Sequence, residues 1–143
     1  MFGEGGTITE KEIQLLSIKQ IESVIFDLTD SLGAKQTEKT LEILDNLLYQ
    51  KEPIQKILIT LYNHFKKLYL CKIAIELNKD IVNSLNLKPN QTFLISKYKR
   101  QVSYFKDNNI KQIIDELVKL DYNSKIGNID LDIGLRSILC SYC

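Results

Sequence analysis

The 143-residue sequence has few residues that interrupt a helix and none of the segments that direct a chain to a membrane. It holds two prolines and six glycines, and no apolar run approaches the roughly 20 residues that a membrane-spanning helix needs. The first residues, MFGEGG, lack the basic and apolar regions of a signal peptide, so we expect residues 1–7 to form a flexible leader. The formal net charge of +1 excludes a strong overall attraction to nucleic acid or membranes.

The three cysteines occur without a secretory signal, which indicates a reducing compartment. Cys140 and Cys143 form a C-x-x-C pair. They fall at the end of the last expected helix, where the helix dipole does not lower the pKa of a thiol. A zinc site needs two further ligands, and only Cys71 and His64 remain. We therefore interpret the cysteines as small apolar residues and expect no metal site.

Nucleotide-binding and catalytic motifs are also missing. Neither G-x-x-x-x-G-K-[ST] nor G-x-G-x-x-G after a strand occurs, and the glycine-rich start at residues 3–6 lacks the lysine of a phosphate loop. His64 lies at the edge of an apolar helix face with no Asp, Glu or Ser partner nearby in sequence. Helix capping and solvation account for Asp27 and Asp30. We expect no catalytic residue, no cofactor, and no ATPase, polymerase or redox activity.

What is present is a long helical pattern over residues 53–78, with a proline only at its start. At about 100° per residue, one apolar stripe contains Ile54, Ile57, Leu58, Leu61, Phe65 and Leu68. From Tyr69 onward we expect the apolar face to widen and to include Leu70, Ile73, Ile75 and Leu77. A helix whose buried face changes along its length has different neighbours at its two ends. This pattern predicts the central helix of an all-α domain.

Capping residues and helix-stop signals predict the other helices. Thr9 and Ser17 each begin a capping box, Gly33 and Gly127 are stop signals, and aspartates precede the later helices. The expected helices span residues 9–16, 17–33, 37–50, 80–85, 90–105, 108–126 and 130–142, with caps at Asp80, Asp107 and Asp130. No strand or repeat is evident. We predict an all-α bundle of six to eight helices joined by short loops.

The best local basic patch is the run around Lys97 and Arg100. Lys97, Arg100 and Tyr104 share one helix face by their i, i+3, i+7 spacing. Such a face can hold a phosphate and stack a base, although charged runs usually only solvate a helix. An interaction module is favoured over an enzyme. The alternative is a stand-alone DNA-binding domain that uses a helix-turn-helix over residues 80–105, with the basic helix at residues 90–105.

The order of local motifs resembles the delta subunit of bacterial DNA polymerase III. The motifs are IFDLTDSLG (residues 25–33), LEILDNLL (41–48), EPIQKILITLYNHFKKLYLCK (52–72), LNLKP (85–89) and LVKLDYNSKIGNIDLDIGLRSIL (117–139). The last segment is similar to the family's closing pattern of an Asp, a Lys-x-Gly and an Asp before a leucine-rich helix. The resemblance covers nearly everything after Thr7.

That resemblance implies that the chain is one part of a clamp-loader protein. Residues 8–17 correspond to the end of a helical lid, and residues 18–143 to the C-terminal helical collar, which packs against the collars of the other loader proteins. The implied partners are the gamma/tau ATPase subunits and delta-prime, with the sliding clamp reached only through a first domain absent from this sequence. The family is a non-catalytic part of a DNA-directed DNA polymerase complex and does not hydrolyse ATP. It implies a bacterial cytoplasmic location at the replisome, with DNA inside the assembled loader and no membrane.

An assembly module keeps apolar surfaces that meet its neighbours, so we expect apolar patches of several hundred Å² on a charged exterior. The candidate interface residues are Tyr122, Ile126, Ile133, Leu135 and Ile138. In isolation, such patches are expected to pair weakly with copies of themselves.

Overall fold

The computed structural model describes residues 10–106 and 108–142 as an all-helical fold, with side chains described from residue 20 onward. These residues contain seven α-helices, one short 3₁₀ helix (η1) and no strand, which confirms the predicted all-α class and helix number. In chain order the elements are α1 (Glu10–Gly33), α2 (Thr37–Tyr49), α3 (Ile54–Glu76), α4 (Ile81–Leu85), η1 (Pro89–Gln91), α5 (Leu94–Tyr104), α6 (Asn109–Lys125) and α7 (Leu131–Ser141).

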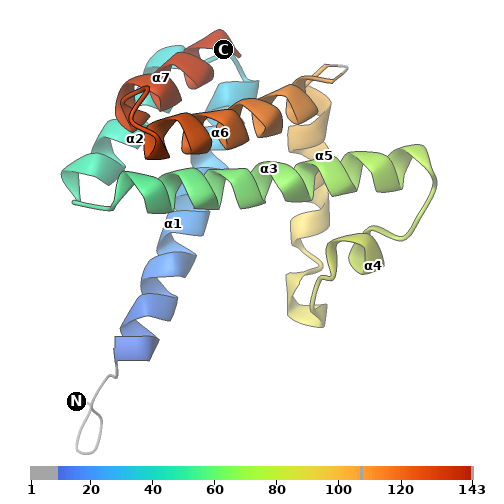
Figure 1. The fold of residues 1–143 in the computed structure, drawn as a ribbon. Helices are drawn as coiled ribbons and strands as arrows, with labels where there is room; N and C mark the ends of the chain where they lie inside the picture. The colour runs from blue at the N-terminus through green and yellow to red at the C-terminus, as the bar shows by residue number, and fades with distance from the viewer. Residues whose placement is uncertain (1–9, 107, 143) are drawn as a thin grey trace, which may run out of the picture.

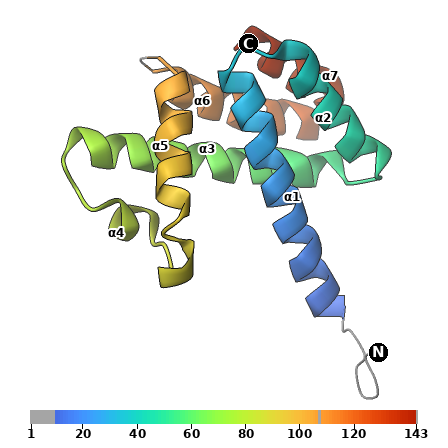
Figure 2. The same ribbon diagram turned by 180° about the vertical axis from the view of Figure 1, so that it is seen from behind.

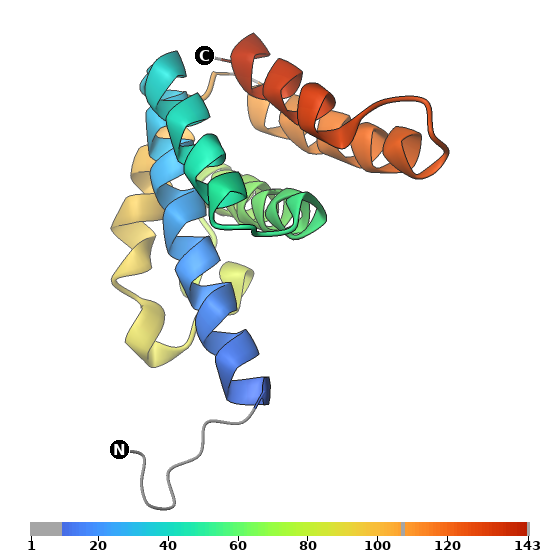
Figure 3. The same cartoon turned by 90° about the vertical axis from the view of Figure 1, so that its left-hand side faces the viewer.

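Helix α3 is the centre of the fold and packs against α1, α4, α5, α6 and α7. It runs across the middle of the molecule, with α2 and α7 near its first half and α4 and α5 near its second half (Figure 1). From behind, α1 and α5 both cross α3 (Figure 2). Seen along α3, the α1–α2 pair and α5 lie on one side and the α6–α7 hairpin on the other (Figure 3). The predicted central helix is therefore confirmed.

The first half of α3 buries the expected stripe. Ile57, Leu58, Leu61, Phe65 and Leu68 are all at most 2% exposed. They pack with apolar residues of the surrounding helices, which include Ile25 and Leu28 of α1, Leu44 of α2, Ile113 and Leu117 of α6, and Leu135 of α7. Burying a large aliphatic side chain stabilises a fold by roughly 1.5–3 kcal/mol, so this shared cluster carries much of the stability of the domain.

The predicted widening of the apolar face after Tyr69 is wrong. Leu70, Ile75 and Leu77 are 37%, 42% and 58% exposed, whereas Cys71 and Ala74 are buried. The stripe keeps its helical period, so the positions three and six residues after Leu68 face inward. These inward positions hold small side chains, and α4 and α5 pack against this end of α3.

Helix ends follow local chemistry where a polar side chain or a left-handed residue is available. The Asp80 carboxylate accepts a hydrogen bond from the Val82 amide, and the Asp130 carboxylate accepts from the Asp132 and Ile133 amides, as predicted. Gly127 has a φ of +81° after α6, which suits a stop signal without a Cβ. The predicted cap Asp107 lies outside the described residues. Helix α5 begins at Leu94, later than predicted, because residues 88–91 close a 3₁₀ turn held by the Lys88 amide and the Gln91 side chain.

Two predictions about α1 are wrong. The helix is continuous through Ser17, since no glycine or proline interrupts it there, so the expected break at that residue does not occur. The proposed boundary between residues 17 and 18 thus falls inside one helix. Gly33 is the last helical residue, and the left-handed position is Lys35 instead (φ 65°). A Cβ on Gly33 would lie 2.5 Å from Cδ2 of Tyr104, so this glycine is required by the close approach of α5.

Candidate functional site

The candidate interface residues divide into two groups. Tyr122, Ile126 and Ile133 are 64%, 52% and 66% exposed, as an interface requires. Leu135 and Ile138 are 0% and 9% exposed and belong to the core cluster, so their assignment to a surface is wrong. The reason is the position of α7, whose inner face packs on α6, α2 and α3. Ile133 and Ile138 are five residues apart, which is about 140° around a helix, so they point to different sides.

The exposed residues belong to a larger apolar surface on the α6–α7 hairpin. Val118, Tyr122 and Ile126 repeat every four residues, which places them on one stripe of α6. Ile129, in the connection, and Ile133, in the first turn of α7, are 40% and 66% exposed. We call Val118, Tyr122, Ile126, Ile129 and Ile133 the α6–α7 apolar surface. Five exposed large apolar residues on two consecutive helices and their connection are more than the scattered single residues of an ordinary exterior.

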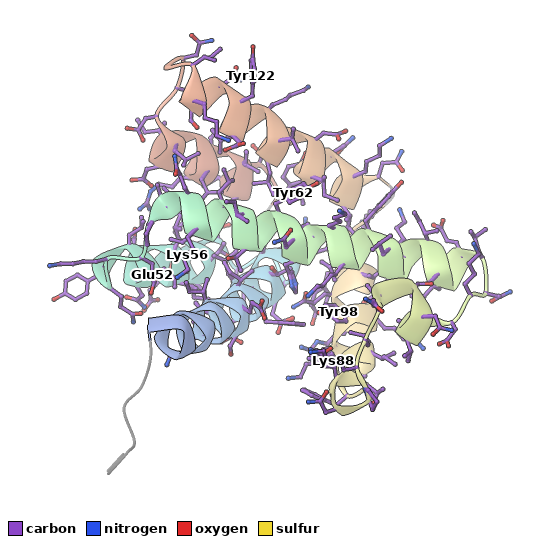
Figure 4. All side chains as sticks on the ribbon, turned by 60° about the horizontal axis from the view of Figure 1, so that its bottom comes forward. Glu52, Lys56, Tyr62, Lys88, Tyr98 and Tyr122 are labelled. Carbon is purple, nitrogen blue, oxygen red and sulfur yellow. The ribbon has the colours of Figure 1, made fainter. Side chains whose placement is uncertain are left out.

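A groove of about 290 Å³ extends this surface onto α3. Leu58, Ile59 and Tyr62 line it from α3, and Leu117 and Val118 line it from α6. Tyr62 lies on the side of α3 that faces α6, the helix that carries Tyr122 (Figure 4). The polar edge is neutral, because the Asp121 carboxylate pairs with Lys125 at 3.1 Å. Val118, Ile59 and Ile129 were not predicted as surface residues from the sequence, although an apolar residue on the polar side of an amphipathic helix is a usable signal.

The three predicted DNA-contact residues do not form one open face. Lys97 is exposed, and its Nζ lies 5.6 Å from the ring centre of Phe93. Arg100 donates to Oδ2 of Asp30 at 3.0 Å, which joins α5 to α1. Tyr104 is half-buried against Gly33. Tyr104 is thus held in the packing of α5 on α1, and the DNA contact itself stays a prediction.

The helix-turn-helix alternative does not have the required geometry. Helix α4 has five residues, and α5 begins only after a segment that contains η1. A DNA-binding helix-turn-helix joins its two helices through a turn of about three to four residues. Residues 86–93 separate the two helices here, so the prediction of this motif over residues 80–105 is wrong.

His64 is buried rather than at the edge of a face, with 7% of its surface exposed. The side-chain amide of Gln101 donates to the Phe26 carbonyl at 3.0 Å and to Oδ1 of Asp30 at 2.7 Å. Its oxygen therefore faces Nε2 of His64 at 2.6 Å, and that nitrogen carries the proton and donates it. This chain of hydrogen bonds joins α1, α3 and α5 within the core.

The pKa of His64 is lowered from 6.5 to about 4, chiefly by burial. The hydrogen bond to Gln101 and the charge of Asp30 act in the opposite direction, and the charge of Lys67 adds to the lowering. The imidazole is therefore neutral at pH 7 and has the environment of a structural core histidine.

We expect acid to destabilise the domain through His64. The unfolded chain binds a proton below about pH 6.5, and the folded chain binds it only near pH 4. The contribution of neutral His64 to the free energy of unfolding is therefore complete above pH 6.5, and it falls by about 3 kcal/mol as the pH drops to 4. Urea unfolding between pH 7 and 4 measures the loss. His64→Gln, which keeps a hydrogen-bond donor but does not titrate, should show a flatter pH dependence, and equal curves for the two proteins would contradict the assignment.

The cysteines and Asp30 have structural environments. Cys71 is buried in the core, and burial raises the pKa of its thiol. Cys140 is exposed in the last turn of α7, and Cys143 lies outside the described residues. Asp30 accepts hydrogen bonds from Arg100 and Gln101. Among the described side chains, those of residues 20–106 and 108–142, no cluster of three His, Cys, Asp or Glu residues can hold a metal ion. No helix in the described part of the chain is long and apolar enough to cross a membrane.

Comparisons with known proteins agree over almost the whole chain. A family model described as "DNA polymerase III delta subunit, C-terminal domain" matches residues 22–142. The chain is 26% identical over 140 residues to the DNA polymerase III subunit delta of Bacillus subtilis, covering 96% of this chain and 40% of that protein. It is 30% identical over 139 residues to the probable DNA polymerase III subunit delta of Aquifex aeolicus, covering 94% and 39% of the two.

A solved structure shows the same fold. The Bacillus subtilis DNA clamp loader delta protein superposes with a TM-score of 0.77 at 25% identity. The match covers 99% of this chain and 42% of that protein. The chain thus spans about two fifths of the length of the relatives it matches.

Proposed function

Because the chain belongs to the family of C-terminal domains of the DNA polymerase III delta subunit, we propose that it is an assembly module of a clamp loader, the complex that places the sliding clamp on primed DNA. In this role it packs, as a helical collar, against the collars of the other loader proteins. The proposed partners are the gamma/tau ATPase subunits and delta-prime. The proposed location is the bacterial cytoplasm, at the replisome.

The observation that carries the proposal is the α6–α7 apolar surface, together with the groove on α3. Ile133 is 66% exposed and Ile126 52% exposed, although the rest of the α6–α7 exterior carries charged and polar side chains. Exposed apolar patches of several hundred Å² mark sites of protein association. We propose this surface, without Leu135 and Ile138, as the contact with a neighbouring loader protein.

Two parts of the chain would have different roles in the loader. Residues 8–17 would continue a helical lid, and residues 18–143 would form the collar. Contact with the sliding clamp would belong to the part of the relatives that this chain does not span. The collar role needs no catalytic residue, since packing against other proteins requires only complementary surfaces.

We expect a lysine placed in the α6–α7 apolar surface to weaken partner binding without unfolding the domain. Ile126→Lys and Ile133→Lys each put a charge where the partner would bury it, so the affinity for the gamma/tau ATPase or delta-prime should fall at least about tenfold. Calorimetric titration of the purified proteins measures this change. Tyr49→Lys, at a residue 87% exposed at the end of α2, is the matched control and should bind normally. Unchanged affinity in both α6–α7 variants would place the interface elsewhere.

A further inference from the structure

A cleft of about 470 Å³ lies where α1 and α5 meet α3, on the side of α3 away from the α6–α7 hairpin (Figure 3). Its α3 wall extends from Pro53 to Lys67, and Tyr98 of α5 lies at the Lys67 end. The cleft shares only Ile59 and Asn63 with the groove that extends the α6–α7 apolar surface. Its volume is within the range of small-ligand sites, about 300–1,000 Å³. The cleft is therefore a separate candidate site.

Three rings from three helices form the inner end of this cleft. The ring centre of Phe26 lies 4.5 Å from that of His64 and 5.2 Å from that of Tyr98, and the last two are 6.0 Å apart. His64 and Tyr98 are 7% and 2% exposed, and the Gln101 side chain holds His64 through a hydrogen bond. The rings are thus fixed by packing before any ligand arrives. A pre-formed aromatic surface favours an aromatic group, which packs against rings by stacking or edge-to-face contact.

The hydroxyl group of Tyr98 has no hydrogen-bond partner among the described residues. Buried tyrosine hydroxyls usually have one, so this group is an exception in a residue that is 2% exposed and lines the cleft. Burial, and after it the charge of Glu22, raises the pKa of Tyr98 to about 12. The hydroxyl therefore keeps its proton at neutral pH and is a donor for an acceptor atom in the cleft.

Two unpaired charges of opposite sign line the same end of the cleft. Glu22 of α1 and Lys67 of α3 are exposed, and neither forms an ion pair in the described part of the chain. The charge of Glu22 acts on Tyr98 and that of Lys67 on His64, so both lie near the three rings. Lys56, the other charged residue of the lining, is paired with Glu52 at 3.8 Å. A ligand that pairs with both free charges carries an ammonium group and a carboxylate.

We propose that the inner end of this cleft binds a small zwitterion with an aromatic side chain, of the class of free aromatic amino acids and short peptides that contain one. The ligand's ring packs on Phe26 and Tyr98, its ammonium group pairs with Glu22, and its carboxylate pairs with Lys67. The Tyr98 hydroxyl donates to an oxygen of the ligand. A polyanion does not fit, because Glu22 would face a like charge. The inference does not depend on the proposed assembly role, since the chain alone carries the site.

His64 provides a site-specific readout because it is the only histidine of the chain and lies in the floor of the cleft. The experiment follows its imidazole proton resonances by NMR at pH 7 while L-phenylalanine or glycyl-L-phenylalanine is added to the 143-residue chain. We expect a saturable shift of these resonances. Tighter binding of the dipeptide would assign the site to short peptides, and tighter binding of the amino acid to free amino acids; both support the proposal.

Paired changes in protein and ligand test the two charge contacts. Glu22→Gln and Lys67→Gln should each weaken the binding of L-phenylalanine by about twofold to fivefold. Glu22→Gln should not weaken the binding of N-acetyl-L-phenylalanine, which lacks the ammonium group, and Lys67→Gln should not weaken that of L-phenylalanine amide, which lacks the carboxylate. Tyr98→Phe keeps the ring and removes the hydroxyl, so it should weaken L-phenylalanine by about threefold to tenfold. Circular dichroism should show all three variants folded.

Neighbouring charges outside the cleft are the matched controls. Asp27→Asn on α1 and Lys66→Gln on α3 remove exposed charges that do not line the cleft, and both variants should bind L-phenylalanine like the unchanged chain. The proposal is overturned if no probe shifts the His64 resonances. It is also overturned if the two controls lose as much affinity as Glu22→Gln and Lys67→Gln, or if Tyr98→Phe binds L-phenylalanine with unchanged affinity.

Discussion

Leu61→Asp is expected to abolish the cooperative unfolding of this domain. Leu61 is 0% exposed in the middle of α3, the helix that packs against α1, α4, α5, α6 and α7. A carboxylate there loses its hydration, and no cationic side chain is among the described core residues that could pair with it. The cost of burying such a group is several kcal/mol, and the lost leucine packing adds about 2–5 kcal/mol. The total is comparable to the whole stability of a small domain, about 5–15 kcal/mol.

The control for this variant lies two residues away on the same helix. Ile59 is 57% exposed, so Ile59→Asp keeps its charge in water. Circular dichroism during heating should show a cooperative transition for Ile59→Asp and none for Leu61→Asp. A soluble Leu61→Asp protein with a cooperative transition would contradict a core centred on α3.

Ile138→Lys is expected to unfold the domain or to destabilise it by about 3 kcal/mol or more. Ile138 is 9% exposed and belongs to the cluster that joins α7 to α6, α2 and α3. Replacing it with lysine removes a buried aliphatic side chain and forces an ammonium group into the core or the helix out of it. Urea unfolding monitored by circular dichroism measures the loss.

Ile133→Lys is the matched substitution on the same helix. Because Ile133 is 66% exposed, the lysine stays in water and the urea midpoint should change little. Equal destabilisation by the two substitutions would show that α7 does not present the faces described above. Unfolding of both variants also shows which of them can be used to measure partner binding, since a loss of binding reports on the interface only in a variant that remains folded.

The α2–α7 contact adds a second constraint on α7 that is independent of its apolar face. The Arg136 guanidinium donates to Asp45 of α2 at 2.6 Å and to Asp132, in its own helix, at 2.7 Å. Exposed ion pairs stabilise proteins by at most about 1 kcal/mol, so this bridge orients α7 more than it stabilises the domain. It leaves Ile133 on the outer face, where the proposed partner would bind.

The sequence by itself determined the helices and the family. Periodicity identified residues 53–78 as the central helix, and the aspartate caps at Asp80 and Asp130 predicted two helix starts that the structure has. These features are local: a capping side chain bonds amides two or three residues away, and an apolar stripe is defined within one helix. The order of the short motifs was sufficient to indicate the delta-subunit family.

Only the tertiary structure decided which apolar and charged residues are available to a partner. Ile133 and Ile138 are both isoleucines of α7. Ile133 is exposed because no helix in the described part of the chain covers its side of α7, whereas Ile138 is buried. Arg100 and Tyr104 share a helix face with Lys97. Arg100, however, is paired with Asp30, and Tyr104 packs against Gly33, each about 70 residues earlier in the chain. Helical periodicity fixes which residues share a face. Whether that face meets water or another helix depends on contacts between segments distant in sequence, which no local pattern records.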